Sequence, residues 1–563
     1  MIGETFYDLQ SNSGMQNRIY AHADGTVGAV YTMGFDYPPF PDRGTGYNYF
    51  DGSGWGVYPT VAIEDERTGW PSYAPWGENG EIVVAHYSGA STEGLVISSR
   101  VEKGAGDWTA IDFYGPDASH SYIWPRSATG GVDNNDLHIL ALTLPVSNGG
   151  SIYEGMDGAL LYSRSPNGGQ TWDYEHVLLD GINSDFYMGF SSDSYEIQAK
   201  GDLVAIVAGD EWTGLVLMKS TDKGETWEKT VIWEHPYPLL DPNGSATTEI
   251  FYNADGSHCL AFDASGKVHV AFGISRSYVD TGQYYWFPEV DGIGYWNEDM
   301  PAFSNDLNAL SPYGDPGSEL IEDYNLIGWS QDINGNGELD LLDDWGQYYC
   351  GLSSMPQLVI DDWNRVYLVY SSVTEMYDNG EQNYRHIWAR ASADGGESWG
   401  NFVDLTEDLI YVVSECVFPS CSQRSDDMIY LLFQEDSEPG MAVRGDEDPY
   451  GDNNIVFMSI YKEEPIGDMG HLAGIVADDD TGLPIENATV EMAGTGYSAT
   501  TQPDGSYLIT IGTGTFNVAC SAMGYYNSDG SAEITMGDTT FLDFQLEPAT
   551  GLNPPQNLKV SIN

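Results

Sequence analysis

The chain has 563 residues, of which 86 are Asp or Glu and 20 are Lys or Arg, so its formal net charge is −66. A charge of this sign repels nucleic acids and anionic membranes, which excludes both as expected partners and favours divalent cations, basic partners or a salt-rich medium. No apolar run is long enough to span a membrane, and Met1 does not begin a secretory signal. The five cysteines match neither a disulfide framework nor a zinc pattern.

Residues 1–465 contain a repeated unit: a short strand, a turn with Asp or Gly, and a strand rich in β-branched residues. The units begin at Arg18, Trp70, Trp124, Tyr187, Leu260, Met355 and Val417. The intervals between these starting residues are typical of the four-stranded blades of a β-propeller. We therefore predict an all-β fold with seven blades, or six if one short unit is not a blade. The early segment 5–9 is expected to pair with the last blade, which removes a free sheet edge.

Three tight turns recur between these units, at Ser165–Trp172, Ser220–Trp227 and Ser392–Trp399. In each, Ser is followed two residues later by Asp or Asn, then by Gly, a hydroxyl residue and Trp. The Asp or Asn side chain accepts backbone N–H groups of the turn, Gly adopts positive φ, and the hydroxyl closes the loop. The Trp ring is expected to pack beside the strand. The sequence thus predicts three hairpin turns held by their own side chains.

This S-x-D-x-G-x-T-W pattern resembles the Asp-box, or BNR repeat, of sialidase-like β-propellers. The resemblance implies that these turns lie at the outer ends of blades, far from the channel mouth where such proteins bind ligands. For a sialidase it also implies three carboxylate-binding arginines, a Tyr–Glu pair and an Asp acid/base. Arg18-Ile19 stands where that family has Arg-Ile-Pro, but Tyr20 replaces the proline.

Four residues are candidates for ligand binding at the channel mouth: Arg18, Trp70, Trp124 and Arg126. The arginines could form a cationic cluster, although each could instead pair with an abundant carboxylate. The tryptophans, each followed by proline, could stack on sugar rings or pack between blades. Tyr195-Glu196 cannot act as a catalytic Tyr–Glu pair, because adjacent side chains of a strand point to opposite faces.

The longest interval between units predicts an insertion at about residues 284–351. Within it, Asp332–Asp343 has the pattern of an EF-hand-type loop, with oxygen side chains at positions 1, 3, 5, 9 and 12 and Gly at position 6. Asp rather than Glu at the last position resembles the dockerin type of loop. The bland alternative is an acidic turn. We predict a structural calcium site with the ligands Asp332, Asn334, Asn336, Glu338 (through its carbonyl), Asp340 and Asp343.

After residue 465 the chain changes to short strands rich in Gly and Thr. Residues 470–548 resemble the carboxypeptidase-regulatory-like domain, which implies a small transthyretin-like β-sandwich that acts as a spacer or adhesive module. Residues 549–563 form a linker and resemble the first strand of a fibronectin type III domain, which implies a longer multidomain chain. This order of domains is typical of exported bacterial proteins attached to the cell surface.

The sequence therefore predicts a secreted or bacterial cell-surface protein, stabilised by calcium, that acts as a binding, adhesion or scaffold module for a glycan or protein ligand. The alternative is a glycoside hydrolase of the sialidase type. The two differ in geometry. Three guanidinium groups converging on one channel mouth beside a Tyr–Glu pair would favour the enzyme, whereas their absence would favour binding.

Overall fold

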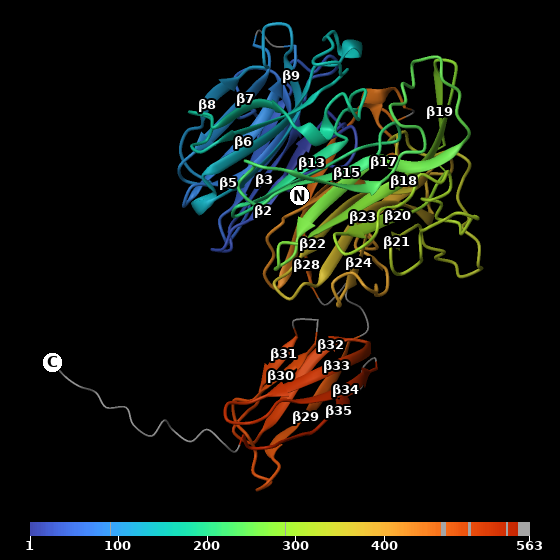
Figure 1. The fold of residues 1–563 in the computed structure, drawn as a ribbon. Coiled ribbons are helices and arrows are strands. Elements are labelled where there is room, and N and C mark those ends of the chain that lie inside the picture. The colour runs from blue at the N-terminus through green and yellow to red at the C-terminus, as the bar shows by residue number, and fades with distance from the viewer. Residues whose placement is uncertain are drawn as a thin grey trace, which may run out of the picture. The chain divides into compact units, whose positions relative to one another are not determined.

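The computed structural model describes residues 1–549 except 90–91, 288, 447, 463–468, 494–496 and 536–538. The predicted fibronectin-like strand lies outside the described residues, from residue 550 onward. The chain divides into two compact units (Figure 1). The first unit comprises residues 1–361, 367–390 and 402–462, and the second contains the chain from 463 together with 362–366 and 391–401.

The first unit is built from small sheets whose strands pair mostly in chain order. The first four sheets are β2 (Ile19–Ala21) to β4, β5 to β8, β9 to β12 and β13 to β16. The remaining strands of these sheets are β3 (Val27–Met33), β4 (Gly44–Phe50), β5 (Thr68–Trp76), β6 (Gly80–Tyr87), β7 (Leu95–Arg100), β8 (Thr109–Phe113), β9 (Tyr122–Gly130), β10 (Asp136–Thr143), β11 (Leu160–Ser165), β12 (Tyr174–Leu178), β13 (Tyr195–Lys200), β14 (Leu203–Ala208), β15 (Leu215–Ser220) and β16 (Glu228–Trp233).

Three further sheets complete the first unit, and the last of them includes β1 (Gly3–Thr5) from the start of the chain. Their strands are β17 (Phe251–Phe262), β18 (Val268–Asp280), β19 (Gln283–Phe287), β20 (Ile293–Asn297) and β21 (Leu326–Gly328); β22 (Ser353–Ile360), β23 (Val366–Asp378), β24 (Asn383–Ser392) and β25 (Val403–Asp404); and β26 (Glu415–Cys421), β27 (Met428–Asp436) and β28 (Asn453–Tyr461). The described residues of this unit thus form seven sheets, as many as the units counted in the sequence.

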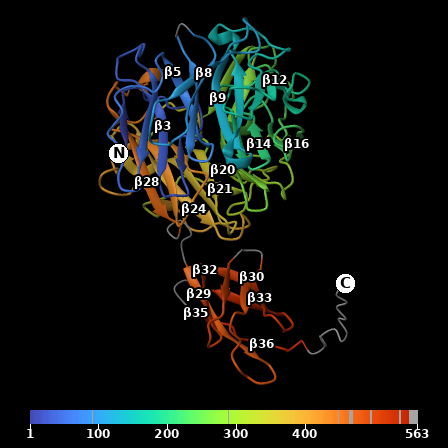
Figure 2. The ribbon, with the colours of Figure 1, turned by 90° about the vertical axis from the view of Figure 1, so that its left-hand side faces the viewer.

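The first strands of the seven sheets contact one another in a closed order, from β2 through β5, β9, β13, β17, β22 and β26 back to β2. Figures 1 and 2 show the sheets arranged around this inner set. In the residues that the structure describes, helix is limited to single turns of 3₁₀ type: Val132–Asn134, Val146–Asn148, Asp180–Ile182 and Ala442–Arg444. The prediction of an all-β propeller with a separate small sandwich is confirmed. None of the helices in the described part of the chain is long and apolar enough to cross a membrane.

Every inner strand has one residue with left-handed backbone at or just before it. Four of these seven residues precede a proline. The pairing register shifts at three of those four and also at Gly256, and each shift marks a β-bulge. Proline suits a bulge because it cannot donate to the ladder. The Trp-Pro, Met-Pro and Phe-Pro pairs therefore mark a repeated kink of the inner strand. The seven residues are Asn17, Trp70, Trp124, Asp193, Gly256, Met355 and Phe418.

The insertion predicted at about 284–351 is not a single inserted block. β20 and β21 lie inside that range and are hydrogen-bonded members of the fifth sheet. β19 extends a long hairpin from β18. The additional chain therefore lies in two loops, 298–325 and 329–352, and the second of these contains the predicted calcium-binding stretch.

The three repeated turns join the third and fourth strands of their sheets. In the turn after β15, Ser220 Oγ accepts the Gly224 N–H at 2.7 Å and Asp222 Oδ1 accepts the Thr226 N–H at 2.9 Å. The other two turns repeat both bonds with Ser165 and Asn167, and with Ser392 and Asp394. The turn chemistry read from the sequence is thus present, and its role is to fix the ends of the hairpins.

The second unit contains two sheets that pack on a shared core of apolar side chains including Leu472, Val490, Val518 and Phe544. One sheet pairs β32, β29 and β35, with β36 also on β29, and the other pairs β31, β30, β33 and β34. These strands are β29 (Met469–Asp478), β30 (Thr489–Met492), β31 (Ser498–Thr500), β32 (Ser506–Gly512), β33 (Gly514–Ser521), β34 (Ser528–Ile534), β35 (Thr539–Phe541) and β36 (Phe544–Leu546).

Candidate functional site

The centre of the first unit is filled by residues 10–17, which we call the channel segment. Gln10 exchanges hydrogen bonds with Thr32 of the first sheet, at 2.8 and 2.9 Å. Asn17 accepts from the second sheet and donates to the third and fourth. Gln16 donates to the His258 carbonyl in the fifth sheet, and Met15 accepts from Gln357 in the sixth. Because one segment bonds to strands around the ring, it lies inside the channel, where a cavity of about 80 Å³ remains beside Asn17.

Arg18 and Arg126 are fully buried beneath this segment. Arg126 Nη2 lies 3.0 Å from Asp193 Oδ1 and donates to the Ser11 hydroxyl and the Gly14 carbonyl. Arg18 Nη2 donates to the Gln10 carbonyl at 2.9 Å. Burial and the neighbouring Arg126 charge lower the pKa of Arg18 to about 9. The two predicted arginines thus come together, but they hold the chain's own segment.

The two predicted tryptophans are also buried. Trp70 Nε1 donates to Asp193 Oδ2 at 2.7 Å, beside the Asn12 N–H that binds the same oxygen at 2.8 Å. The Trp124 carbonyl accepts the Tyr195 hydroxyl at 2.7 Å, and the ring belongs to the main apolar core. Asp193, which the sequence did not single out, is therefore the centre of this cluster. None of the four predicted residues is open to a ligand in this arrangement.

The other groups that a sialidase-type site would need do not join this cluster. Tyr195 bonds to the Trp124 carbonyl, whereas Glu196 accepts the Leu260 N–H, as expected for neighbours on opposite faces of a strand. Burial raises the pKa of Glu196 to about 8. Arg276 lies over the Phe287 ring at 4.7 Å on the β18–β19 hairpin. Arg276 therefore serves the hairpin and is not a third arginine beside Arg18 and Arg126.

The stretch Asp332–Asp343 folds back on itself in the manner of its motif. The Asp332 carboxylate accepts the N–H groups of Gly335 and Gly337, both at 2.7 Å. The amides of Asn334 and Asn336 both donate to Asp340 Oδ2, at 3.2 and 2.7 Å. Five of the six predicted ligands are thus joined in one network, to which Glu338 contributes its N–H as a donor to Asn336 Oδ1.

Glu375 of β23, which the sequence did not single out, holds this loop by hydrogen bonds. Its buried carboxylate accepts the N–H groups of Ile333, Asn334 and Asp340 and the amide of Asn334. Within the described residues, no three Asp, Glu, His or Cys side chains gather closely enough to hold a metal ion. A calcium ion here would therefore need amide and carbonyl oxygens as well, and rotating the two Asn amides would present such oxygens.

A cavity of about 370 Å³ opens beside the end of that stretch, and we call it the Tyr349 cavity. Its aromatic wall consists of Trp286, Trp345 and Tyr349, with the Trp286 and Tyr349 rings 6.0 Å apart. The Tyr349 side chain is 54% exposed, and the guanidinium of Arg444 lies 4.4 Å from its ring. The polar wall residues are Asp343, Asp344, Gln347 and Arg385. Aromatic faces beside carboxylate and amide groups suit a ligand that is both flat and rich in hydroxyls.

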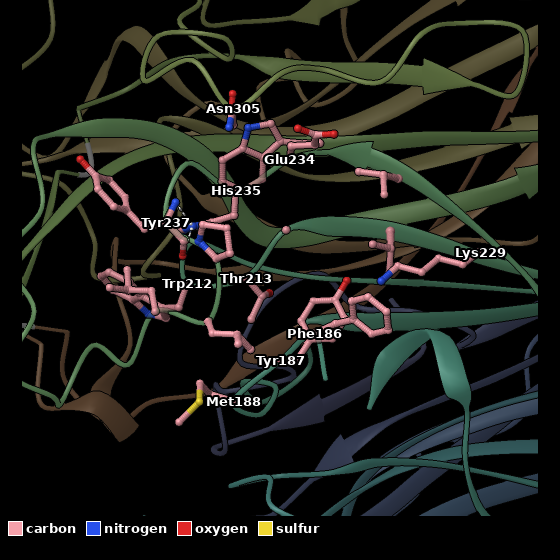
Figure 3. Close-up of a pocket in the computed structure, with 17 residues that line it drawn as sticks. Phe186, Tyr187, Met188, Trp212, Thr213, Lys229, Glu234, His235, Tyr237 and Asn305 are labelled. Atoms are coloured by element: carbon pink, nitrogen blue, oxygen red, sulfur yellow. Dashed lines mark hydrogen bonds between the residues drawn. The ribbon is translucent and has the colours of Figure 1, made fainter. Parts of the chain in front are cut away.

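A second cavity, of about 250 Å³, lies between the loops that precede β13 and β17, and we call it the Lys229 cavity (Figure 3). Its wall is mostly apolar and includes Phe186, Met188, Trp212 and Tyr237. The His235 ring in this wall is held on both sides, because Nε2 contacts the Glu211 carbonyl and Nδ1 accepts the Tyr237 N–H. Burial lowers the pKa of His235, so it is a neutral structural residue.

Lys229 extends from β16 along this cavity. Its Nζ lies 3.9 Å from the centroid of the Phe186 ring and 5.0 Å from that of Tyr187. Burial lowers the pKa of Lys229. A cation over an aromatic face contributes about 0.5–1 kcal/mol at exposed sites. Sequence reasoning missed this residue because a single lysine on a strand carries no motif.

The family of carboxypeptidase regulatory-like domains matches residues 471–547, which lie in the second unit. Carboxypeptidase D of Anas platyrhynchos is 28% identical over 182 residues, which are 32% of this chain and 10% of that protein. The chain thus spans about a tenth of the length of the curated relative it matches. The family match describes the second unit, and neither likeness gives an activity for the first.

Among solved structures, a polysaccharide lyase described as an ulvan lyase is 12% identical, with a TM-score of 0.41 over 81% of this chain and 95% of that one. The Trypanosoma rangeli sialidase in complex with sialic acid is 11% identical, with a TM-score of 0.30 over 69% of this chain and 53% of that one. Identities and TM-scores this low carry no information on activity.

Proposed function

We propose that the chain is a secreted or cell-surface binding protein whose first unit holds a glycan in the Tyr349 cavity, while the second unit acts as a spacer or adhesive module. The observation that carries the proposal is the contrast between the two candidate places. The arginines of the channel are held by the chain's own residues, whereas the Tyr349 cavity has an exposed tyrosine and two partly buried tryptophans beside carboxylate and amide groups.

The alternative is a glycoside hydrolase of the sialidase type. That chemistry needs arginines free to hold a substrate carboxylate, but Arg18 and Arg126 hold Gln10, Gly14 and Asp193. A protein ligand remains a second kind of partner for the same cavity. The net charge of −66 makes nucleic acid an unfavourable partner.

Removing one aromatic ring of the cavity wall should weaken glycan binding without unfolding the protein. We expect Trp286→Ala and Tyr349→Ala each to weaken binding by about tenfold, because each ring contributes on the order of 1 kcal/mol beyond its buried area. A glycan array read with the labelled chain identifies the ligand, and calorimetry measures the variants. Tyr114→Ala, which removes an exposed ring elsewhere, is the matched control.

Two outcomes would count against this proposal. If the chain bound no glycan on the array, or if Tyr114→Ala lost as much affinity as the cavity variants, the Tyr349 cavity would not be the glycan site. Release of a fluorophore from a synthetic sialoside by the purified chain would instead support the hydrolase.

We also propose that calcium binds the stretch Asp332–Asp343 and stabilises the first unit. Calcium at about 100 times its dissociation constant should then raise the free energy of unfolding by roughly 2.7 kcal/mol. The double variant Asp332→Ala, Asp340→Ala should lose this gain, as measured by thermal unfolding with calcium and with magnesium. A variant with the same charge change, Glu102→Ala with Glu154→Ala, serves as the control. Equal calcium responses in both double variants would sink the proposal.

A further inference from the structure

We propose that the Lys229 cavity binds a group that joins an apolar body to a carboxylate, with the ammonium of Lys229 as its counter-ion. This site is separate from the Tyr349 cavity, and the proposal goes beyond the proposed function because it does not depend on glycan binding there. Figure 3 shows the Lys229 side chain reaching over Phe186 along one wall.

The ammonium of Lys229 differs from every other lysine that the structure describes. Five of the seven lysines in these residues form ion pairs, and Lys200 donates to the Asp263 carbonyl. Within the same residues Lys229 has neither a carboxylate within ion-pair distance nor an oxygen acceptor. In a chain with more than four acidic residues for each basic one, a cation without a carboxylate is unexpected. The missing counter-charge points to a ligand.

Lys219 shows what the same sheet does with a lysine that serves the fold. It lies on β15, next to the strand of Lys229, and its Nζ is 2.6 Å from Glu298 and 2.8 Å from the Gly266 carbonyl. Glu234 does line the cavity of Lys229, but the two form no ion pair. Figure 3 places Glu234 with Asn305 at one side and Lys229 with Phe186 and Tyr187 at the other.

The other residues of the cavity wall favour a ligand whose main part is apolar. Trp212, Tyr237 and Leu239 give rings and an alkyl group, and Met188 is 44% exposed at the rim. Thr213 and His235 are already bonded within the protein. Few polar groups are therefore left for a ligand besides Lys229, Glu234 and Asn305. A volume of about 250 Å³ lies just below the ~300–1,000 Å³ of typical ligand pockets, so one ring or one apolar side chain fits.

The overall charge of the protein works against an anionic ligand at long range, whereas the partly buried lysine attracts it at contact. Salt separates these effects, because the Debye length falls from about 10 Å at 0.1 M to about 3 Å at 1 M salt. The repulsion from distant carboxylates is screened first, and a partly buried pair is screened much less. Binding should therefore be measured in roughly 0.5 M salt.

The test uses four probes that differ in one group: phenylacetate and phenylacetamide, and a peptide ending in phenylalanine with a free or an amidated terminus. We expect the full chain to bind a carboxylate probe at least about tenfold more tightly than its amide. Lys229→Met should equalise the two members of each pair, and Lys229→Arg should keep the preference. Lys219→Met is the control, and thermal unfolding reports whether each variant is folded.

The two pairs of probes distinguish the source of the carboxylate. Preference within the phenylacetate pair assigns a free aromatic acid, and preference within the peptide pair alone assigns a chain terminus. Equal binding of carboxylate and amide by the unaltered chain would overturn the proposal. So would a preference that survives in folded Lys229→Met, and so would the absence of binding by all four probes.

Discussion

Asp193→Ala should lower the free energy of unfolding by about 3–5 kcal/mol, the cost of leaving one partner of a buried ion pair behind. The Arg126 guanidinium would stay buried in the channel with no carboxylate, and burial has already lowered the pKa of neighbouring Arg18. The Trp70 Nε1–H and the Asn12 N–H would also lose their acceptor. Urea unfolding followed by tryptophan fluorescence measures the change.

A matched variant distinguishes the cost of breaking a buried ion pair from the cost of breaking an exposed one. Asp173 pairs with Arg164 at 2.9 Å, but its side chain is 44% exposed, so Asp173→Ala should cost no more than about 1 kcal/mol. The double variant Arg126→Met, Asp193→Leu should recover much of the loss, because apolar residues can replace a buried pair. Equal effects of the two single variants would contradict this picture of the channel.

Stability should fall as the pH rises from about 6.5 to 9, because three buried carboxyl groups meet where the chain's start joins the seventh sheet. Burial raises the pKa of Asp8 to about 7, of Asp436 to about 8 and of Asp448 to about 6. The Asp448 charge raises the first two further. The folded state therefore keeps protons that the unfolded chain releases near pH 4.

The sign follows from proton counting. A carboxyl group whose pKa is higher in the folded state than in the unfolded chain stabilises the fold at low pH. Its contribution is fully present below about pH 4 and is lost as the pH rises through the folded-state pKa. From pH 6.5 to 8 the loss through Asp436 alone is on the order of 2 kcal/mol. Exposed carboxylates are ionised throughout this range and histidines with lowered pKa, such as His258, are already neutral. Neither group offsets the fall.

Urea midpoints at pH 6.5, 7.5 and 9 measure this dependence. Asp436→Asn should make it shallower and should raise stability at pH 9, because the amide cannot ionise while Asp8 still does. Asp426→Asn removes an exposed carboxylate of the same sheet region and should leave the slope unchanged. If Asp436→Asn kept the slope of the unaltered chain, the titrating groups would have to lie elsewhere.

The propeller could be predicted because its signals are local. Turns such as Ser220–Trp227 bond within themselves, and Trp70-Pro71 marks a bulge that two other Trp-Pro or Phe-Pro pairs of the inner strands repeat. The fifth sheet was harder, because its third and fourth strands are separated by the loop 298–325 and carry no turn signature. Spacing alone therefore assigned β20 and β21 to an insertion.

The candidate site could not be predicted for the opposite reason. Arg18 and Arg126 lie at the inner strands, but nothing in the sequence indicates that residues 10–17 enter the channel and take their hydrogen bonds. Lys229 becomes informative only when the structure places its ammonium over the Phe186 ring and, within the described residues, beside no carboxylate. Glu375 lies far along the chain from the loop it supports, so the loop motif does not include it.

The channel segment also has a mechanical consequence. β1 pairs with β28 through only three residues, and the chain then passes directly into the channel. A force on the first residues would separate this short pairing and begin to withdraw residues 10–17, one contact after another. A force on the end of β28 would instead shear a strand paired along its length with β27. The propeller should therefore resist load at residue 461 far better than at residue 1.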